Sequence, residues 1–177
     1  GLGFEAGPDT GKKVAIVGGG PAGLAAAYQL RRKGHACTIF EANDALGGMF
    51  KFGIPGYRVP RDKLDSEIQR IIDMGVEVKL KTKVGTDVAV EDLERDYDAV
   101  LWGIGCQSGR GLPVPGWEGT PNCVSGVAFL KAFNEGRMKV TAEKVVCIGG
   151  GDTSIDVVSV ARRIGHIQHT KPTDLPE

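Results

Sequence analysis

KVAIVGGGPAGLAAAYQLRRKGH, residues 13–35, is the stretch that decides the fold. A short apolar run opens it, Gly18, Gly20 and Gly23 come next, and the rest reads as a helix that ends in Arg-Arg. Backbone N–H groups at the start of a helix can bind a pyrophosphate, provided that no side chain keeps the ligand away. The three glycines meet that condition, and Pro21 suits the first helical turn because it has no N–H to leave unpaired. The stretch therefore predicts a strand, a phosphate-binding turn and a helix.

The same unit occurs a second time in the chain. KVVCIGGGDTSIDVVSVARRIGH, residues 144–166, aligns with residues 13–35 without a gap. Both copies predict an apolar strand, a glycine turn and a helix, and Gly34 and Gly165 suit the left-handed position that ends a helix. Ser154 stands where the first copy has its third glycine, and a small residue there still permits close packing. The repeat predicts two dinucleotide-binding units.

The two copies differ in the residues that come after them. After the first, residues 36–40 read as a second strand that leads to Glu41, about 20 residues beyond the glycine turn. A carboxylate at that distance can accept hydrogen bonds from the ribose hydroxyls of a bound dinucleotide. After the second copy, residues 167–177 contain two prolines and several polar residues, and do not read as a buried parallel strand. The first unit is predicted to be a complete β-α-β unit and the second to be unfinished.

The remaining patterns complete the predicted fold. Apolar spacing predicts a helix over residues 62–74, strands over residues 76–80 and 97–102, and a short helix over residues 127–134. Residues 111–122 hold three prolines and several glycines, a composition typical of a crossover between domains. We therefore expect an α/β protein with an N-terminal extension, a Rossmann-like domain, a linker and the start of a second, incomplete Rossmann-like domain, over residues 1–11, 12–110, 111–122 and 123–177 respectively.

Composition excludes several classes of function. Lys plus Arg equals Asp plus Glu, at 22 each, so no field of one sign attracts nucleic acid or anionic lipid. The four cysteines show no C-x-x-C or zinc-like spacing, so we expect reduced core thiols and no metal site. No basic patch followed by an apolar stretch opens the chain, and no run of about 18 apolar residues occurs. We expect a soluble, cytoplasmic protein with no nucleic-acid partner and no membrane insertion.

A longer stretch after the first unit carries a family resemblance. EANDALGGMFKFGIPGYRVPRDKL, residues 41–64, resembles the FAD domain of the glutamate synthase small-subunit-like NAD(P)H oxidoreductases, and dihydropyrimidine dehydrogenase contains a similar module. The resemblance covers about residues 11–165. The features that match are Glu41, the Gly47-Gly48 pair, Gly53-Ile54-Pro55, Tyr57-Arg58-Val59-Pro60 and Val84-Gly85.

The resemblance implies that the first domain binds FAD. Gly48 would lie against the FAD phosphates, Arg58 would reach the cofactor, and the backbone near Val84 would receive the adenine. Residues 103–105 read Gly-Ile-Gly where the family usually has Ala-Thr-Gly. The backbone can still approach FAD at Gly105, but Ile104 lacks the hydroxyl that threonine would provide. The predicted FAD contacts are Gly18, Gly20, Pro21, Ala22, Gly23, Glu41, Gly47, Gly48, Arg58, Val84 and Gly105.

The resemblance also implies that the second, partial domain binds NAD(P)H. Residues 149–156, GGGDTSID, resemble the NAD(P)-binding turn of the family. The predicted contacts are Gly149, Gly150, Gly151, Asp152 and Thr153. The choice between NADH and NADPH depends on the residue after the second strand of this unit, and the sequence shows no such strand, so the choice stays open.

By the same resemblance, the protein is an oxidoreductase that moves a hydride from NAD(P)H to FAD and passes the electrons to an iron–sulfur partner subunit or domain. The iron–sulfur clusters are expected only on absent sequence or on partner subunits, because the cysteine-rich segment that the family commonly carries upstream does not occur in residues 1–11. The cofactors carry the chemistry, so no catalytic acid or base is predicted. The terminal acceptor stays open, with glutamate synthase-like and aldehyde oxidoreductase-like enzymes as the expected settings.

Of three rival functions, the sequence excludes one and leaves two open. A disulfide reductase would need paired redox cysteines soon after the first unit, where residues 47–50 read GGMF, and we reject it. A ferredoxin–NAD(P) reductase of the adrenodoxin-reductase type shares the two-domain plan and stays open. A noncatalytic FAD-holding scaffold also stays open, because the second domain is predicted to be incomplete.

Overall fold

The computed structural model describes residues 3–109, 111–117, 120–138 and 143–166. The chain divides into two compact units, the first formed by Gly1–Phe50 and Arg61–Gly105, the second by Lys51–Pro60 and Cys106–Glu177. Residues 51–60 thus cluster with the second unit, although they lie inside the first predicted domain in sequence. The predicted end of the first domain at residue 110 lies close to the division after Gly105.

The first unit is built on a parallel sheet of four strands in the order β3-β2-β1-β4. The strands are β1 (Lys13–Val17), β2 (Ala36–Phe40), β3 (Val76–Lys79) and β4 (Ala99–Trp102). Val14 of β1 lies opposite Cys37 of β2 on one side and Ala99 of β4 on the other. Parallel neighbours need a crossover between them, and helices supply it here. The α/β class and the strands expected in this unit are confirmed.

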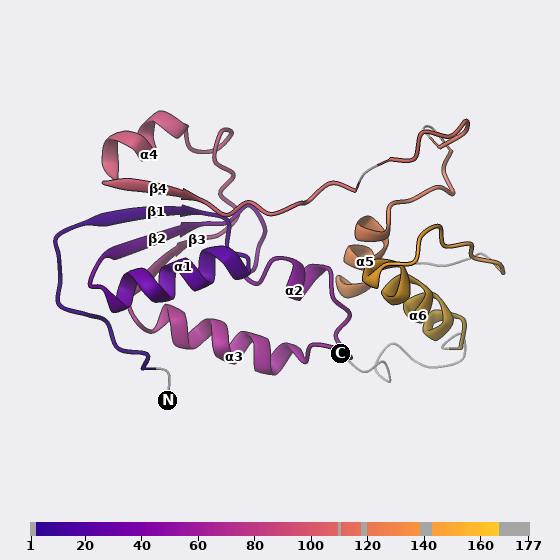
Figure 1. Ribbon diagram of the computed structural model, residues 1–177, viewed down its shortest axis with the longest axis horizontal. Helices are drawn as coiled ribbons and strands as arrows, with labels where there is room; N and C mark the ends of the chain where they lie inside the picture. The colour runs from indigo at the N-terminus through magenta and orange to yellow at the C-terminus, as the bar shows by residue number, and fades with distance from the viewer. Residues whose placement is uncertain (1–2, 110, 118–119, 139–142, 167–177) are drawn as a thin grey trace. The chain divides into compact units, whose positions relative to one another are not determined.

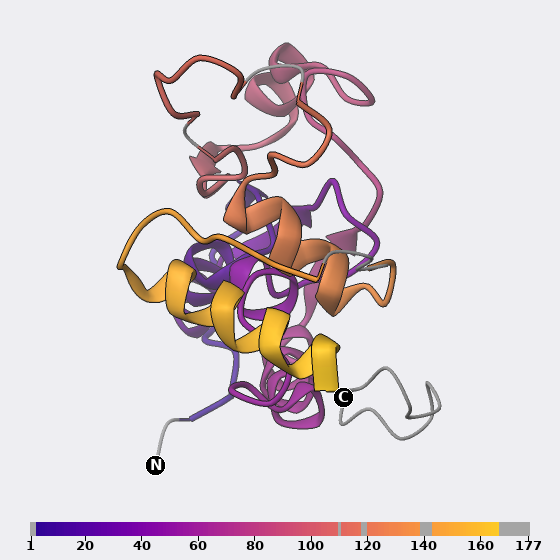
Figure 2. The same ribbon diagram turned by 90° about the vertical axis from the view of Figure 1, so that its right-hand side faces the viewer.

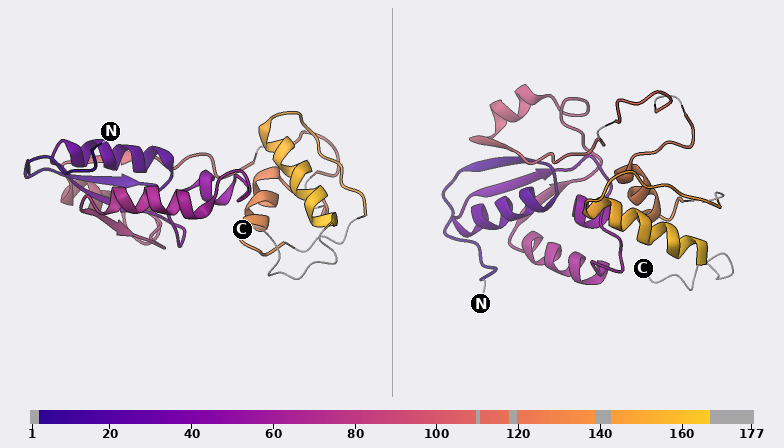
Figure 3. Two further views of the ribbon diagram at one scale, coloured as in Figure 1. Left: turned by 90° about the horizontal axis from the view of Figure 1, so that it is seen from below. Right: turned by 45° about the vertical axis from the view of Figure 1, so that its right-hand side comes forward.

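Helices lie on both faces of this sheet (Figure 1). α1 (Pro21–Arg32) and α3 (Arg61–Ile72) lie side by side on one face (Figure 3), and α4 (Val90–Asp96) lies on the other. β1, α1 and β2 together form the β-α-β unit that the sequence predicts, and α3 corresponds to the helix expected over residues 62–74. The N-terminus of α1 therefore lies at the carboxyl end of β1, the edge where parallel sheets bind ligands.

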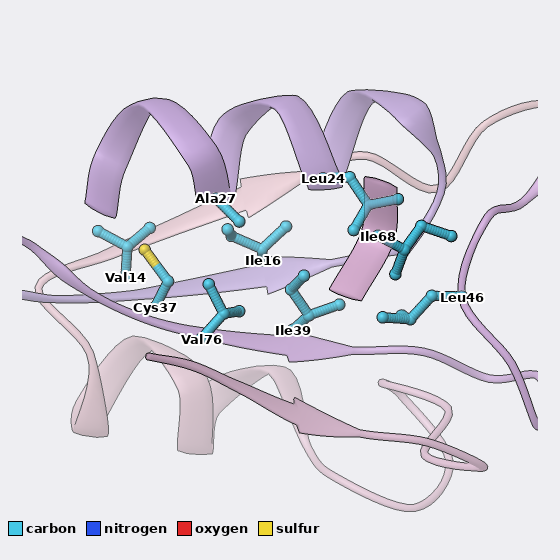
Figure 4. Close-up of a cluster of buried hydrophobic side chains, with 9 residues drawn as sticks. All are labelled: Val14, Ile16, Leu24, Ala27, Cys37, Ile39, Leu46, Ile68 and Val76. Carbon is cyan, nitrogen blue, oxygen red and sulfur yellow. The ribbon is translucent and has the colours of Figure 1, made fainter. Parts of the chain in front are cut away.

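Alternation along the strands divides the core of the first unit between the two faces. The cluster on the side of α1 and α3 consists of Val14, Ile16, Leu24, Ala27, Cys37, Ile39, Leu46, Ile68 and Val76 (Figure 4). The cluster on the side of α4 consists of Ala15, Val17, Phe40 and Leu93. Because both faces are covered, β1 and β2 read as continuous apolar runs and not as alternating ones.

The cysteines divide into buried and exposed thiols, all of them free. Cys37 is buried on β2, where burial raises the pKa of its thiol, and Cys147 is half-buried. Cys106 and Cys123 are exposed, so the expectation that all four are core thiols is wrong for these two. Both lie in irregular segments of the second unit, where no strand of the described residues buries them.

The N-terminal extension holds the end of α1. The Gly7 N–H donates to the Arg31 carbonyl at 2.9 Å, and the Thr10 N–H donates to the Gly34 carbonyl at 3.1 Å. Gly34 has φ of 87°, as the predicted left-handed position requires. The equivalent Gly165 does not end its helix, since α6 (Asp152–His166) continues through it. The prediction that Gly165 ends its helix is therefore wrong. Among the described residues, no segment binds the end of α6 as the N-terminal extension binds the end of α1.

The second unit contains two main helices, α5 (Gly126–Asn134) and α6, which pack against each other (Figure 2). Leu130, Val157 and Val160 form their buried contact. The short α2 (Met49–Phe52) lies where the chain passes from the first unit to the second. No described helix, in either unit, has the length and the apolar character needed to cross a membrane.

The strand predicted at the start of the second repeat is not formed. Residues 144–150 have no regular structure, and Val146 and Ile148 are 86% and 70% exposed. A strand is stabilised by backbone hydrogen bonds to a neighbour, and every strand of the described residues pairs inside the first unit. An apolar run alone is therefore insufficient here. Residues 167–177, on which the prediction of an unfinished second unit rests, lie outside the described residues.

Replacement of Ile16 tests the assignment of the core. Ile16 lies on β1 and is fully buried, so we expect Ile16→Ala to reduce the free energy of unfolding by about 2–5 kcal/mol through lost contacts and a residual cavity. Leu80→Ala, at a side chain that is 40% exposed, serves as the control and should change it by less than about 0.5 kcal/mol. Urea denaturation followed by circular dichroism measures both. Equal effects would contradict the assignment.

Candidate dinucleotide-binding site

The first glycine turn connects β1 to α1, and its three glycines meet different constraints. Gly18 has φ of 107°, and a Cβ there would lie 2.4 Å from the Gly103 carbonyl oxygen. A Cβ on Gly23 would lie 1.9 Å from the Gly18 carbonyl oxygen, so α1 can approach β1 only with glycine at that position. A Cβ on Gly20 would come no closer than 3.7 Å, to the Cα of Gly48. The protein's own packing therefore requires the first and third glycines but leaves space above the second.

That space lies at the uncapped start of α1. Gly20 is the N-cap residue and has no side chain to accept a hydrogen bond, and Pro21 occupies the first helical position. N–H groups in the first turn of a helix have no intrahelical acceptor and favour an anion. Ala22 and Gly23 belong to this turn. The turn thus fits the pyrophosphate that the sequence predicts at this position.

Glu41 ties the end of β2 to the glycine turn. The side chain is only 6% exposed, and its Oε2 accepts a hydrogen bond from the Gly19 N–H at 2.7 Å. Its Oε1 accepts from the backbone N–H and the side-chain Nδ2 of Asn43, at 2.8 and 2.7 Å. A carboxylate offers about four lone-pair positions, so one position on Oε2 stays open for a ribose hydroxyl beside these three donors. Sequence reasoning predicted the position of Glu41 but missed its partners.

A second loop lies against the first turn. The Gly47 N–H donates to the Gly19 carbonyl at 2.8 Å. Gly48 has φ of 51°, and a Cβ there would lie 2.8 Å from the Cα of Gly20 and 3.4 Å from the Cδ of Pro21. The structure therefore brings Gly48 beside Gly20 of the first turn, where the sequence predicts the phosphates.

The remaining predicted residues of the first unit lie at neighbouring turns. The Gly103 N–H donates to the Val17 carbonyl at 2.8 Å, which places the turn after β4 beside the end of β1, and Gly105 lies two residues on with φ of 64°. Val84 forms an isolated bridge with Val88 and packs against the cluster on the α4 face. Their contacts with FAD stay predictions.

The second glycine turn repeats the local geometry of the first. Gly149 has φ of 126°, comparable to Gly18, and a Cβ there would lie 2.7 Å from the Oγ of Ser154. Gly150 and Gly151 have no neighbour within 4 Å of an added Cβ, so the space above them is open. α6 begins at Asp152, directly after the turn. The predicted NAD(P)H contacts from Gly149 to Thr153 thus form a continuous, exposed turn at a helix N-terminus.

Arg58 lies in the second unit and pairs with α6. Its Nη1 lies 2.6 Å from the Oδ1 of Asp156, a carboxylate that is 6% exposed. This hydrogen bond, together with the charges of Asp156 and Asp152, raises the pKa of the Arg58 guanidinium. The predicted contact of Arg58 with FAD stays a prediction. Asp156 was not among the predicted residues, although it closes the GGGDTSID motif.

Two comparisons with known sequences show the family of the chain. The sequence profile described as Pyridine nucleotide-disulphide oxidoreductase matches residues 12–171. The chain is 47% identical over 158 residues to the NADP(+)-dependent formate dehydrogenase subunit beta of Moorella thermoacetica, which covers 88% of this chain and 22% of that protein. It is 39% identical over 170 residues to the glutamate synthase [NADPH] small chain of Mycobacterium tuberculosis, which covers 89% of this chain and 35% of that protein.

A solved structure supports the fold. A 2-naphthoyl-CoA reductase in complex with 2-naphthoyl-CoA matches with a TM-score of 0.69 and 28% identity, over 93% of this chain and 24% of that one. The chain therefore spans about a fifth to a third of the length of these similar proteins.

Two substitutions test separately the packing role of Gly23 and the space beside Gly20. Gly23→Ala forces a Cβ onto the Gly18 carbonyl, so we expect a loss of about 1–3 kcal/mol in the free energy of unfolding. Gly20→Ala meets nothing closer than 3.7 Å and should change the stability of the nucleotide-free protein by less than about 0.5 kcal/mol. Thermal unfolding without nucleotide measures both. A larger loss for Gly20→Ala would refute the assignment of space above Gly20.

Proposed function

Because the chain belongs to the pyridine nucleotide-disulphide oxidoreductase family, we propose that it is the cofactor-binding part of a flavoprotein that passes electrons from NAD(P)H through FAD to an iron–sulfur partner. The observation that carries the proposal is the unequal constraint on the first turn. Gly18 and Gly23 are needed by the fold, whereas Gly20 is left with space that a bound pyrophosphate would occupy. Location in the cytoplasm stays part of the proposal.

The residues of the first unit fit FAD in three ways. The uncapped N-terminus of α1 offers N–H groups to the pyrophosphate, and the backbone at Gly48 lies beside them. Glu41 is held at the turn by Gly19 and would accept a hydrogen bond from the ribose. Val84 and Gly105 of the same unit, with Arg58 of the second unit, complete the proposed set. When bound, FAD supplies the chemistry that accepts a hydride and releases electrons to a one-electron carrier.

The second turn is proposed to hold the nicotinamide dinucleotide. Residues 149–153 repeat the left-handed glycine and the helix start of the first turn, with open space above Gly150 and Gly151. The chain supplies binding and orientation at both sites, so no acid or base of its own is required. The four cysteines do not form a redox pair, so the disulfide chemistry in the family description is not proposed for this chain.

The names of the two relatives support the proposal of a partner subunit. One is a beta subunit and the other a small chain, so each works beside at least one further subunit. We propose an iron–sulfur-containing subunit or domain as the electron acceptor of this chain. Both names also specify the phosphorylated dinucleotide, and the choice between NADH and NADPH here is decided by titration with each.

An anaerobic titration tests the electron transfer directly. The purified, FAD-loaded protein is mixed with NADH or NADPH in the absence of oxygen, and the flavin absorbance is recorded. We expect bleaching with at least one donor. No bleaching with either would overturn the reductase proposal in favour of a noncatalytic FAD-holding role.

Matched valine substitutions test the two sites separately. Gly20→Val places a side chain in the proposed pyrophosphate position and should give a folded but colourless protein. Gly150→Val meets no protein atom and should keep FAD, yet lose reduction by NAD(P)H while dithionite still bleaches the flavin. Absorbance and circular dichroism measure cofactor content and folding. A Gly20→Val protein with stoichiometric FAD would contradict the placement of the first site.

A further inference from the structure

Asp156 is a buried acid that needs a cation. It lies on α6 one helical turn after Asp152, and only 6% of the residue is exposed. A carboxylate removed from water is strongly unfavourable unless it is paired. Among the described residues, Arg58 provides the pairing charge, at 2.6 Å, from a side chain that is itself about half exposed. α6 therefore depends on a residue from a different part of the chain.

The segment that carries Arg58, residues 51–60, is fastened to both helices of its unit. Asn134 Nδ2 of α5 donates to the Phe52 carbonyl at 2.9 Å. The guanidinium of Arg163 on α6 lies 3.8 Å from the centre of the Tyr57 ring, which packs against the Leu130–Val157–Val160 contact. The Tyr57 hydroxyl is buried and has no hydrogen-bond partner within the described part of the chain. Because an unpaired buried hydroxyl is unfavourable, the other contacts of the segment must hold it there.

The first turns of α6 are held from two sides. On one side, α5 approaches so closely that a Cβ on Gly126 would lie 3.1 Å from Thr153 and 3.3 Å from Val157. On the other side, Arg58 binds Asp156, and its charge also acts on Asp152. Asp152 and Thr153 belong to the proposed NAD(P)H turn. The contacts that hold the first turns of α6 therefore also hold this turn.

We propose that Arg58 and Asp156 form a positioning pair for the nicotinamide-dinucleotide site. The pair fixes the start of α6 and, with it, the proposed phosphate-binding turn of residues 149–153. This proposal rests on the proposed function of that turn. It gives Arg58 a role toward NAD(P)H that is separate from any contact with FAD.

Two variants of the purified protein, each of which removes one charge, test the pair. Asp156→Asn and Arg58→Gln each remove the ion pair, and we expect the Kd of the oxidised dinucleotide, NAD⁺ or NADP⁺, measured by equilibrium dialysis, to rise about tenfold. The double variant should be about as weak as either single one, because all three lose the same contact. Arg58→Lys, which keeps the charge, should bind with intermediate affinity. FAD content, read from absorbance, should be unchanged in Asp156→Asn. In the same variant the KM for the nicotinamide dinucleotide should rise, while kcat at saturating dinucleotide should be unchanged.

The exposed Lys12–Asp98 pair of the first unit provides the matched control. Asp98→Asn makes the same chemical change there and should leave the Kd of the dinucleotide unchanged. Binding like that of the unchanged protein in both Asp156→Asn and Arg58→Gln would overturn the role of the pair. So would loss of FAD in Arg58→Gln with unaltered dinucleotide binding, since Arg58 would then serve FAD. Failure of the unchanged protein to bind NAD⁺ or NADP⁺ would instead overturn the proposed function of the turn.

Discussion

The close approach of α1 to the end of β1 is the constraint on which the first unit depends. Gly23 brings the helix within a distance of the Gly18 carbonyl that no Cβ would allow, and Gly18 turns the chain with a left-handed backbone. The N-terminus of α1 is thereby fixed beside the ends of β2 and β4, from which Glu41 and Gly103 meet the turn. Three strand ends and one helix start converge because two residues lack side chains.

The two copies of the repeat show which features are local and which need a partner. Both turns have a left-handed first glycine and, five residues later, a small residue where the helix passes close. The strand before the turn forms only in the first copy, where β2 and β4 lie on either side of it. A turn is encoded by the residues that make it, whereas a strand requires neighbours distant in sequence.

The sequence predicts most of the first unit and less of the second, because apolar periodicity indicates an element only where the element is regular and buried. Apolar periodicity located β1 to β4 and α3 because both faces of the sheet are buried, and the glycine spacing located the turn between β1 and α1. The partners of Glu41 and the pairing of Arg58 with Asp156 could not be predicted, since the latter joins residues 98 positions apart that share no pattern. The exposure of Cys106 and Cys123 was not predicted, because their segments show no apolar periodicity that would indicate burial or exposure.

Residues 51–60 have a consequence for how such a protein could be divided or recombined. The chain passes from the first unit to the second after Phe50, returns at Arg61 and leaves again after Gly105, so three peptide connections join the units. A cut after residue 105 would separate Phe52, Tyr57 and Arg58 from the helices they bind. The two units are therefore not consecutive in sequence. Exchange of the second unit between relatives would have to include this ten-residue segment.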